Sequence, residues 1–540
     1  MSVPDRRAEA LSRRVGVVAH ASHEPSLLKR FAGSRLGSTS IHFIVMFNIM
    51  LGVVALVLDF GLATTIKVRQ QKALDAATLA ASQELGLENA EERGREVASA
   101  FYEANTKRNP AGVEMDFAID TAAGRIMSSA KTAVDTWLMK ALGVTTLDVR
   151  SNTTVARANG TVEVALVLDN SGSMQPHMAQ LREAAKQMSG ILFVGTEGTD
   201  RVRVGLVPFA ASVNVGSHHR SASWIDSSGL SPVHHENFES SARTRFQLFD
   251  DMGVGWGGCV EMRPQPHDVQ LSVPTPSNPA TLFVPMFAPD EPDTINADGK
   301  TYRNSYLVDD GGACTRQARW CVSYSRRGNC TEWYTEPLDP AVAQSRMCKY
   351  SGQTPAGSGP NLNCTTAALL PLTSTKGQIE TAIDGMVASG WTNVQQGVMW
   401  GWRLLSPDPP FTEARPANDD NNRKYLVIMT DGENTYQRHS NQNLSMYGAF
   451  GYLSKARLSQ SNPVSTMNSR TLAACENAKA AGITIFTVAF AEAAASSSAR
   501  NLMRNCASGP GNALLATDGE GLKRAFEDIG REISQLRIAG

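Results

Sequence analysis

The most pronounced hydrophobic pattern along the chain is a long apolar run that begins at Ile41. Between His42 and Asp59 this run, IHFIVMFNIMLGVVALVLDFGLATTI, carries no ionisable side chain. Its length is close to the ~20 residues that a helix needs to cross a bilayer. We therefore predict one transmembrane helix from Ile41 to Ile66. A buried core helix and a cleaved signal peptide are the alternatives, but a signal should be shorter and end in small residues, whereas this run continues into Lys67.

Helical spacing continues beyond the apolar run, in a region from 67 to 160 that we interpret as a stalk. Apolar side chains recur at spacings of three and four as far as Gly86, which predicts that the helix extends outward from the membrane. They are Leu74, Ala77, Ala81 and Leu85.

The rest of the stalk region shows mixed periodicities. Asn89 and Glu92 resemble a capping box, so a second helix is predicted there, with Val97 and Phe101 on one face, up to the break at Pro110. Alternating patterns and helical spacing then predict a small α+β module. Its predicted elements are strands at Val113–Ile119 and Thr146–Val155 and a helix at Lys131–Leu142.

A short apolar, β-branched run, VEVALVLD, begins the next region at Thr161 and is typical of a buried parallel strand. The polar loop Asp169-Asn-Ser171-Gly-Ser173 follows it directly. Pro176 suits a first helical turn, and apolar residues then repeat at helical spacing. They are Met178, Leu181, Ala185, Met188 and Leu192. Strand, polar loop and amphipathic helix in this order predict an α/β fold with a doubly wound, mostly parallel sheet, in which ligands bind at the carboxyl ends of strands.

Two further loops are expected to meet the first one. A predicted helix with Ile379, Ile383 and Val387 on one face ends at Gly390 and is followed by Thr392. The buried strand KYLVIMT runs directly into Asp431-Gly432.

Oxygen-bearing side chains would thus converge from three loops, and they suit a hard divalent cation. Mg²⁺, or Mn²⁺, prefers octahedral oxygen ligands and gives up water reluctantly. Hydroxyls would contact the ion directly, whereas the carboxylates would act largely through bound waters. The predicted metal residues are Asp169, Ser171, Ser173, Thr392 and Asp431. Because its closest protein ligands are neutral, such an ion would stay electrophilic and could take a carboxylate from another molecule, which points to recognition rather than catalysis.

In the order D-x-S-x-S, Thr, Asp-Gly, these residues resemble the metal-ion-dependent adhesion site of von Willebrand factor A domains. The structural alternative is that Asp169 only caps a helix and the serines only shape a turn. The resemblance implies that residues 161–540 form such a domain.

Phrases along most of the chain after residue 40 are similar to TadG-type Flp (tight adherence) pilus assembly proteins. One is VALVLDFGLATTIKVRQQKALDAATLAAS at the apolar run; others are WGGCVEMRP from Trp256, TLFVPMFAPDEPD from Thr281, GPNLNC from Gly359, PLT at Pro371, GWTNVQQGVMWGWRLLSP from Gly390 and CAS at Cys506. This resemblance implies an inner-membrane protein of a bacterial envelope that helps to assemble or anchor pili through contacts with other envelope or secretion components.

Composition and charge narrow the function further. Hydrophobic residues make up 42% of the 540 residues and charged ones 19%, which excludes a disordered chain. The net charge of -1 gives no basic field that would point to nucleic acid. Residues 1–40 differ, because they contain seven Lys and Arg against three Asp and Glu. We interpret them as a basic cytoplasmic arm, although basic residues on both sides of the apolar run leave the positive-inside rule undecided.

All eight cysteines follow the apolar run, and none forms a C-x-x-C pair. Disulfides would place this part of the chain in an oxidising compartment, the periplasm, and eight free thiols in a cytosolic domain are the alternative. Six cysteines fall in a Gly-, Pro- and Ser-rich insertion at about 210–370, where fifteen connectivities are possible. The remaining two, Cys475 and Cys506, flank the predicted strand ITIFTVAF and are expected to pair.

The last stretch of the chain, Gly521 to Leu536, is predicted to be a helix that closes the domain. Its apolar residues Leu522, Phe526, Ile529 and Ile533 fall on one face.

A second candidate metal site is weaker. It consists of His218, His219, His234, His235 and Glu236. These residues lack the spacing of a zinc motif, and a solvated polar loop is favoured there.

A metal-assisted hydrolase is the alternative function, but no Glu, His or Lys stands at motif spacing beside the metal loops as a general base. G-x-S-x-G is also absent around Ser171, and a helix would carry His177 away from it. We therefore expect a binding protein and not an enzyme. A structural subunit whose ion only rigidifies the three loops is the third alternative.

Overall fold

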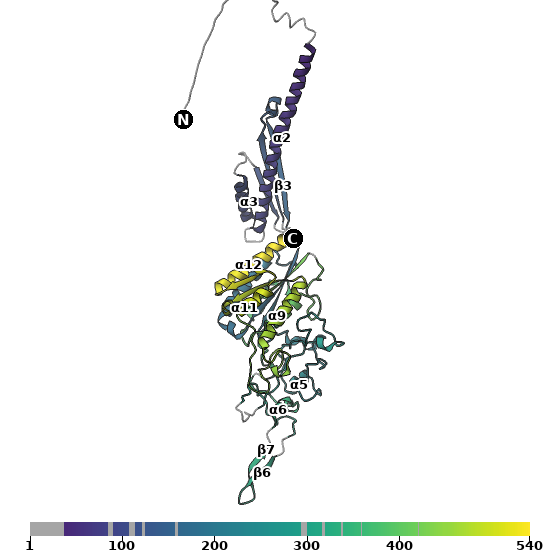
Figure 1. Cartoon of the computed structure of the whole chain (residues 1–540), viewed down its shortest axis with the longest axis vertical. Coiled ribbons are helices and arrows are strands. Elements are labelled where there is room, and N and C mark those ends of the chain that lie inside the picture. Colours follow the sequence, from purple (N-terminus) through teal and green to yellow (C-terminus); the bar gives the residue numbers. More distant parts are fainter. Residues whose placement is uncertain are drawn as a thin grey trace, which may run out of the picture. The chain divides into compact units, whose positions relative to one another are not determined.

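A computed structural model of the protein describes residues 37–539, apart from 85–89, 107–113, 121–124, 157–159, 293–299, 316–318, 336–337, 358 and 420. Most of the predicted basic arm and the predicted cap at Asn89 therefore lie outside the described residues. The chain divides into two compact units, which are treated separately below (Figure 1). The first comprises residues up to Ala80, Arg95–Ala118 and Ile126–Thr154, and the second comprises Ala81–Gly94, Ile119–Arg125 and Val155–Gly540.

The first unit is built on one long helix, α2 (Gly37–Glu84), which covers the predicted transmembrane segment and continues without a break beyond it. In the part of the chain that the structure describes, it is the one helix long and apolar enough to cross a membrane. Only 6% of its most apolar window is buried, unlike a core helix. Farther along, the predicted inner positions Leu74 and Ala77 are fully buried.

Helix α3 (Ala90–Thr106) buries a different face from the one predicted. Ala98 and Tyr102 are buried, whereas Phe101 is 49% exposed. The prediction of a Val97 and Phe101 face was therefore wrong by one position. It relied on side-chain hydrophobicity alone, while the packed face pairs a small alanine with a large tyrosine ring.

A three-stranded sheet of order β1-β2-β3 completes the first unit. Its strands are β1 (Glu114–Asp120), β2 (Arg125–Asp135) and β3 (Thr146–Ala156). The predicted helix at Lys131–Leu142 is wrong, because β2 occupies its first part and a 3-10 helix, Met139–Leu142, its end. Alternate β2 residues are buried from Ile126 to Val134, but several of them are Ser, Thr or Ala, so a search for apolar periodicity misses the strand.

The second unit is a mixed α/β structure around a six-stranded sheet of order β11-β10-β9-β4-β5-β8. The pairs from β11 to β5 are parallel, and β8 joins the edge antiparallel. The strands are β4 (Thr161–Asp169), β5 (Val202–Phe209), β8 (Leu370–Thr373), β9 (Asn422–Thr430), β10 (Thr484–Phe490) and β11 (Ala513–Ala516). The two strands predicted at Thr161 and at KYLVIMT are thus β4 and β9, direct neighbours in the sheet.

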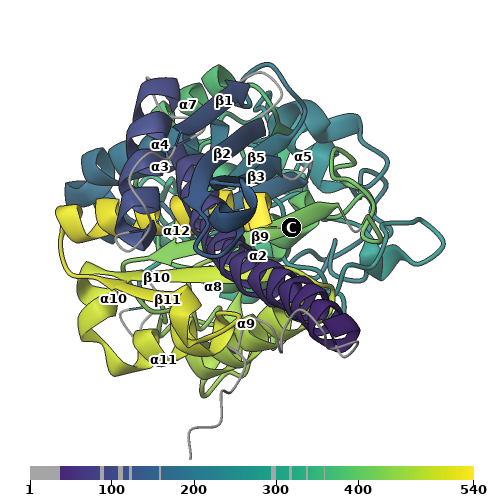
Figure 2. The ribbon, with the colours of Figure 1, turned by 90° about the horizontal axis from the view of Figure 1, so that it is seen from above.

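Helices cover both faces of this sheet, because side chains of β4 point alternately into two separate apolar cores. The helices are α4 (Met178–Phe193), α7 (Lys376–Asp384), α8 (Val394–Leu404), α9 (Pro463–Ala480), α10 (Ala491–Ala495), α11 (Ser497–Cys506) and α12 (Gly519–Ala539). Residues of α4, α7 and α12 form one core and residues of α8, α9 and α11 the other. Figure 2 shows α4 and α7 on one side of the sheet and α9 and α11 on the other.

The predicted inner faces of α4 and α12 are confirmed, since Leu181, Met188, Phe526 and Ile533 are fully buried. The prediction for the helix before Thr392 was partly wrong. Helix α7 ends at Asp384, and Val387 lies beyond it and is 49% exposed.

Helix α8 approaches the sheet unusually closely, because two glycines face β4 and its neighbours. A Cβ added at Gly401 would lie 2.4 Å from a methyl group of Val167, and one at Gly397 would lie 2.8 Å from the Phe209 ring. Only glycine allows this distance between α8 and the strands.

The insertion lies between β5 and β8 and contains little regular structure. Its elements are α5 (Arg245–Asp251), the hairpin β6 (Arg319–Tyr324) and β7 (Cys330–Thr335), and α6 (Pro340–Ser345). Its six cysteines form the disulfides Cys259–Cys364, Cys314–Cys348 and Cys321–Cys330.

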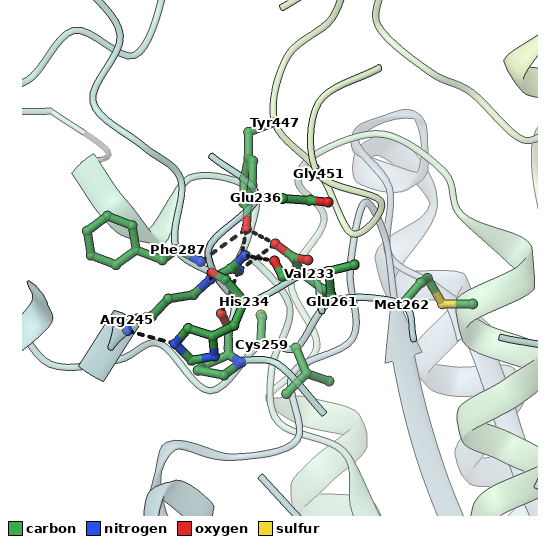
Figure 3. Close-up of polar contacts among 12 residues, drawn as sticks. Val233, His234, Glu236, Arg245, Cys259, Glu261, Met262, Phe287, Tyr447 and Gly451 are labelled. Atoms are coloured by element: carbon green, nitrogen blue, oxygen red, sulfur yellow. Dashed lines mark hydrogen bonds and ion pairs between the residues drawn. The ribbon is translucent and has the colours of Figure 1, made fainter. Parts of the chain in front are cut away.

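A buried ionic network joins the insertion to the segment between β9 and α9 (Figure 3). Arg245 donates to the Glu261 carboxylate at 2.5 Å and to the Tyr447 hydroxyl at 3.1 Å. Arg457 donates to the other Glu261 oxygen at 2.5 Å. Although burial opposes it, the two guanidinium groups hold the pKa of Glu261 below its ordinary value. Buried charges are tolerated here because each has a hydrogen-bonded partner.

Candidate functional site

The first loop of the candidate site follows β4, at the carboxyl end of the central strand. Asp169, the last residue of β4, is fully buried. One of its carboxylate oxygens accepts a hydrogen bond from the backbone N–H of Ser171 at 2.7 Å, and the other accepts one from the Thr430 hydroxyl at 2.6 Å. The carboxylate therefore joins its own loop to the end of the neighbouring strand β9.

A chain of polar contacts connects this loop to the loop after β9. The hydroxyls of Ser171 and Ser173 lie 3.0 Å apart, and Ser173 donates to the Asp431 carboxylate at 2.9 Å. Ser171 and Asp431 are buried, whereas Ser173 is exposed. The group of oxygens is thus open to solvent on the Ser173 side.

The third loop, which carries Thr392, is fastened to the other two through the backbone. Gly172 N–H donates to the Gly390 carbonyl at 2.8 Å. Thr392 N–H donates to the Thr435 hydroxyl, and its carbonyl accepts from Thr435 N–H, both at 3.0 Å. A Cβ added at Gly432 would lie 3.8 Å from the Thr392 hydroxyl oxygen. The structure therefore brings together all five residues that the sequence analysis singled out.

Two carboxylates of this site are buried, and the electrostatic contribution of His177, which favours the charged form of Asp431, does not outweigh burial. Among the described residues, neither Asp169 nor Asp431 forms an ion pair. Burial and the nearby Asp431 carboxylate raise the pKa of Asp169 to about 7, and burial raises the pKa of Asp431 as well. A divalent cation would offset this unfavourable electrostatic energy, so the donor set fits the predicted ion.

The hydroxyl ligands are essential to any such site. Within the described parts of the chain, no group of three or more His, Cys, Asp or Glu side chains is placed to hold a metal ion. A set of two carboxylates and three hydroxyls suits a hard cation such as Mg²⁺ better than zinc, which prefers nitrogen and sulfur ligands.

The sequence analysis missed three residues that hold these loops in place. Thr430 fixes the Asp169 carboxylate, and Thr435 fixes the backbone of Thr392. The side chain of Asn434 accepts a hydrogen bond from Val394 N–H at 2.8 Å, at the start of α8. Thr430 directly precedes Asp431 at the end of the predicted strand, and this position could have identified it as a residue of the site. Thr435 and Asn434 act on residues about 40 positions away, and no local pattern indicates this.

Residues of the candidate histidine cluster contact other protein groups. His234 is buried, and its two ring nitrogens lie 2.7 Å from the Asp226 carboxylate and 3.0 Å from the backbone N–H of Arg245. Glu236 lies 3.3 Å from Arg457. These contacts are structural, but the loop is not the solvated polar loop that the sequence favours, because His234 is fully buried.

The contacts of His177 bear on the hydrolase alternative. Its ring packs edge-to-face on Phe490 with a centroid distance of 5.0 Å. The imidazole also opposes the effect of burial on the Asp431 carboxylate by lowering its pKa, and among the described residues no hydrogen bond joins it to Ser171.

Cys475 of α9 and Cys506 of α11 are joined in a disulfide, with their Cα atoms 5.2 Å apart. Together with the three bonds of the insertion, it uses all eight cysteines of the chain.

Comparisons with known proteins find only distant similarity. No family model and no curated relative matches the chain. Among solved structures, the chain is similar to the open conformation of the pilus adhesin SpaC from Lactobacillus rhamnosus GG, with a TM-score of 0.32 and 13% identity over 78% of this chain and 34% of SpaC. The vWF domain of the type V pili tip protein Mfa5 from Porphyromonas gingivalis gives a TM-score of 0.32 and 9% identity, covering 70% of this chain and 96% of that one. The PilB minor pilin from Streptococcus sanguinis gives 0.29 and 13%, covering 78% of each chain. The chain spans about a third of the length of SpaC.

Proposed function

We propose that this chain is an envelope protein of the TadG type, which assists the assembly or anchoring of pili through metal-dependent binding of another protein. In this proposal the second unit is a doubly wound von Willebrand factor A domain in the periplasm. Helix α2 anchors it in the inner membrane, and the basic arm lies in the cytoplasm. The single observation that carries the proposal is the meeting of Asp169, Ser171, Ser173, Thr392 and Asp431 at one edge of the sheet.

The residues of the site have distinct tasks in this proposal. The hydroxyls of Ser171, Ser173 and Thr392 would hold a Mg²⁺ or Mn²⁺ ion, with Asp169 and Asp431 balancing its charge largely through bound waters. The ion would supply an electrophilic position for an acidic side chain of the partner. Thr430 and Thr435 keep the loops in the geometry that this requires.

The four disulfides support the periplasmic location, since such bonds persist in oxidising compartments. The exposed apolar half of α2 supports the anchor. For an enzyme, no Glu, His or Lys stands at motif spacing beside the metal loops to act as a general base with Ser171. The function proposed here is therefore binding and not hydrolysis.

The proposal is tested by capture of envelope proteins with the full-length protein, after mild crosslinking, in Mg²⁺ and in EDTA. We expect one or more pilus or secretion components to be captured in Mg²⁺ and lost in EDTA, and lost with Asp169→Ala in either condition. Asp200→Ala is the matched control. Asp200 is an exposed carboxylate just before β5, at the opposite edge of the sheet, where it pairs with Arg203. Capture that is equal in EDTA and with Asp169→Ala would rule out metal-dependent binding.

A further inference from the structure

An exposed apolar segment connects β2 to β3 in the first unit. Residues 137–144, WLMKALGV, here named the apolar tip, include the 3-10 helix and a single charged residue, Lys140. Trp137 is 84% exposed and Leu142 65%, and Leu138 and Val144 are exposed as well. A contiguous apolar surface of this kind is usually covered by a partner or a membrane.

Asp59 of α2 holds the apolar tip in place. Its side chain is buried, and its carboxylate accepts three backbone hydrogen bonds: from Trp137 at 3.0 Å, from Leu138 at 3.0 Å and from Met139 at 2.7 Å. These contacts fix the first turn of the apolar tip against the helix.

The sheet continues to contact α2 beyond this point. Ala63 is buried in a small apolar cluster with Val134 of β2 and Val149 of β3. The segment predicted to cross the membrane, 41–66, is therefore covered by protein on one side from Ala55 onward, whereas Phe60 and Leu62 stay exposed, so it cannot face lipid there on all sides.

The longest run of mostly exposed apolar side chains on α2 without a carboxylate ends at Leu58, directly before Asp59. From Ile41 to Leu58 the helix rises about 27 Å at about 1.5 Å per residue, close to the ~30 Å of a hydrocarbon core. A carboxylate is costly inside a bilayer unless its oxygens are satisfied, and Asp59 satisfies them with backbone N–H groups. Asp59 thus marks the boundary between hydrocarbon and headgroups. Figure 1 shows the β2–β3 end of the sheet beside α2, with the Gly37 end of the helix extending beyond it.

We propose that the apolar tip inserts into the interfacial layer of the bilayer that α2 crosses, as a second membrane contact of the first unit. The proposal rests on the membrane anchoring proposed above. A phospholipid surface is the occupant that the geometry favours, because Asp59 holds the apolar tip at the end of the exposed apolar helix. Trp137 is of the type enriched at such interfaces, and Lys140 can extend its charged end to headgroup phosphates.

This second contact has a mechanical consequence. A single helix can rotate and tilt freely in a bilayer, whereas a helix fixed to an inserted loop at its boundary cannot. The apolar tip would set the orientation in which the sheet of the first unit leaves the membrane.

The test is photo-crosslinking to lipid in the full-length protein, reconstituted into vesicles of phosphatidylethanolamine and phosphatidylglycerol. Four variants carry p-benzoylphenylalanine, at Trp137, Leu142, Val54 or Asn152. Val54 is an exposed residue of the apolar helix and reports insertion of α2 itself. Asn152 is an exposed residue of β3, eight residues beyond the tip or about 26 Å along the strand, and is the matched negative control.

We expect lipid adducts at Trp137 and Leu142 with yields comparable to Val54, and none at Asn152 above the unirradiated sample. Adducts at Val54 alone would overturn the inference and leave the anchor intact. Protein adducts at the apolar tip in place of lipid adducts, or equal lipid adducts at Asn152, would also overturn it. No adduct at Val54 would instead overturn the proposed anchor, and the inference with it.

Discussion

At the scale of single residues, Asp169 makes the most specific contribution to the site. Its two oxygens are both used in hydrogen bonds, and a second carboxylate lies close by, yet no cation of the described chain pairs with either group. Such a site stores unfavourable electrostatic energy in the absence of a bound metal. The pH dependence of stability reports that energy directly.

We predict that metal-free protein loses stability relative to its Asp169→Asn variant as pH rises from 5 to 8. The pKa of Asp169 is about 7 in the folded state and near 3.8 when unfolded, so folding favours the protonated carboxyl group. The contribution of this group to the free energy of unfolding is complete below pH 4 and is lost as pH rises through 7. The loss is on the order of a few kcal/mol. The asparagine variant lacks this titration. Denaturant unfolding in EDTA at several pH values measures the difference.

Asp200→Asn is the control for this experiment. Its hydrogen bond with Arg203 lowers the pKa of Asp200, so that this group does not titrate between pH 5 and 8. The difference in unfolding free energy between this variant and the wild type should stay constant over that range. If the difference in unfolding free energy between Asp169→Asn and the wild type also stayed constant from pH 5 to 8, burial would not destabilise the charged Asp169 carboxylate.

The second residue-scale prediction concerns the ionic network of the insertion. Glu261→Gln removes the carboxylate that forms the ion pair with the fully buried Arg245, and breaking a buried pair in this way costs about 3–5 kcal/mol. Asp250→Asn, which breaks the exposed pair of Asp250 with Arg220, should cost less than about 1 kcal/mol. Denaturant unfolding measures both, and equal small effects would show that the network does not stabilise the fold.

At the scale of elements, the close packing of α8 against β4 is the feature most sensitive to small changes. Gly401→Ala would place a methyl group 2.4 Å from Val167, and we predict a destabilisation of about 1–3 kcal/mol. Gly377 of α7 has no atom within 4 Å of an added Cβ, so Gly377→Ala should be neutral or stabilise by up to about 1 kcal/mol. Thermal unfolding of both variants checks this, and Gly401→Ala melting at or above the wild-type temperature would contradict the packing described.

Elements with a clear apolar period could be predicted, and elements without one could not. β4 and β9 follow from short continuous apolar runs, and α4 and α12 from buried apolar residues at spacings of three and four. β2 was missed because its inward side chains include Ser128 and Thr132, so tertiary packing and not hydrophobicity determines its face. The disulfide pairing within the insertion could not be predicted from the sequence. It depends on which distant segments the fold brings together, and contacts between distant polar residues, such as Arg245 and Tyr447, determine this.

At the scale of the whole molecule, one chain combines two features that the sequence predicts separately. The first unit carries the helix that is apolar enough for a membrane, and the second carries three loops that meet at the end of a parallel sheet. The meeting of the loops after β4 and β9 could be predicted because parallel strands end at the same edge. Thr392 follows the helix α7 and not a strand, so its place beside them is implied by the order of the motif. The residues that hold the loops together could not be predicted, since Thr430, Asn434 and Thr435 act through contacts that only the fold creates.

The most direct test of the account is calorimetric titration of the full-length protein with Mn²⁺ or Mg²⁺. We predict saturable binding of one ion by the wild type and by Asp200→Ala, and complete loss of the binding heat with Asp169→Ala although that variant stays folded. Identical heats for the wild type and Asp169→Ala would show that these five side chains do not form a cation site.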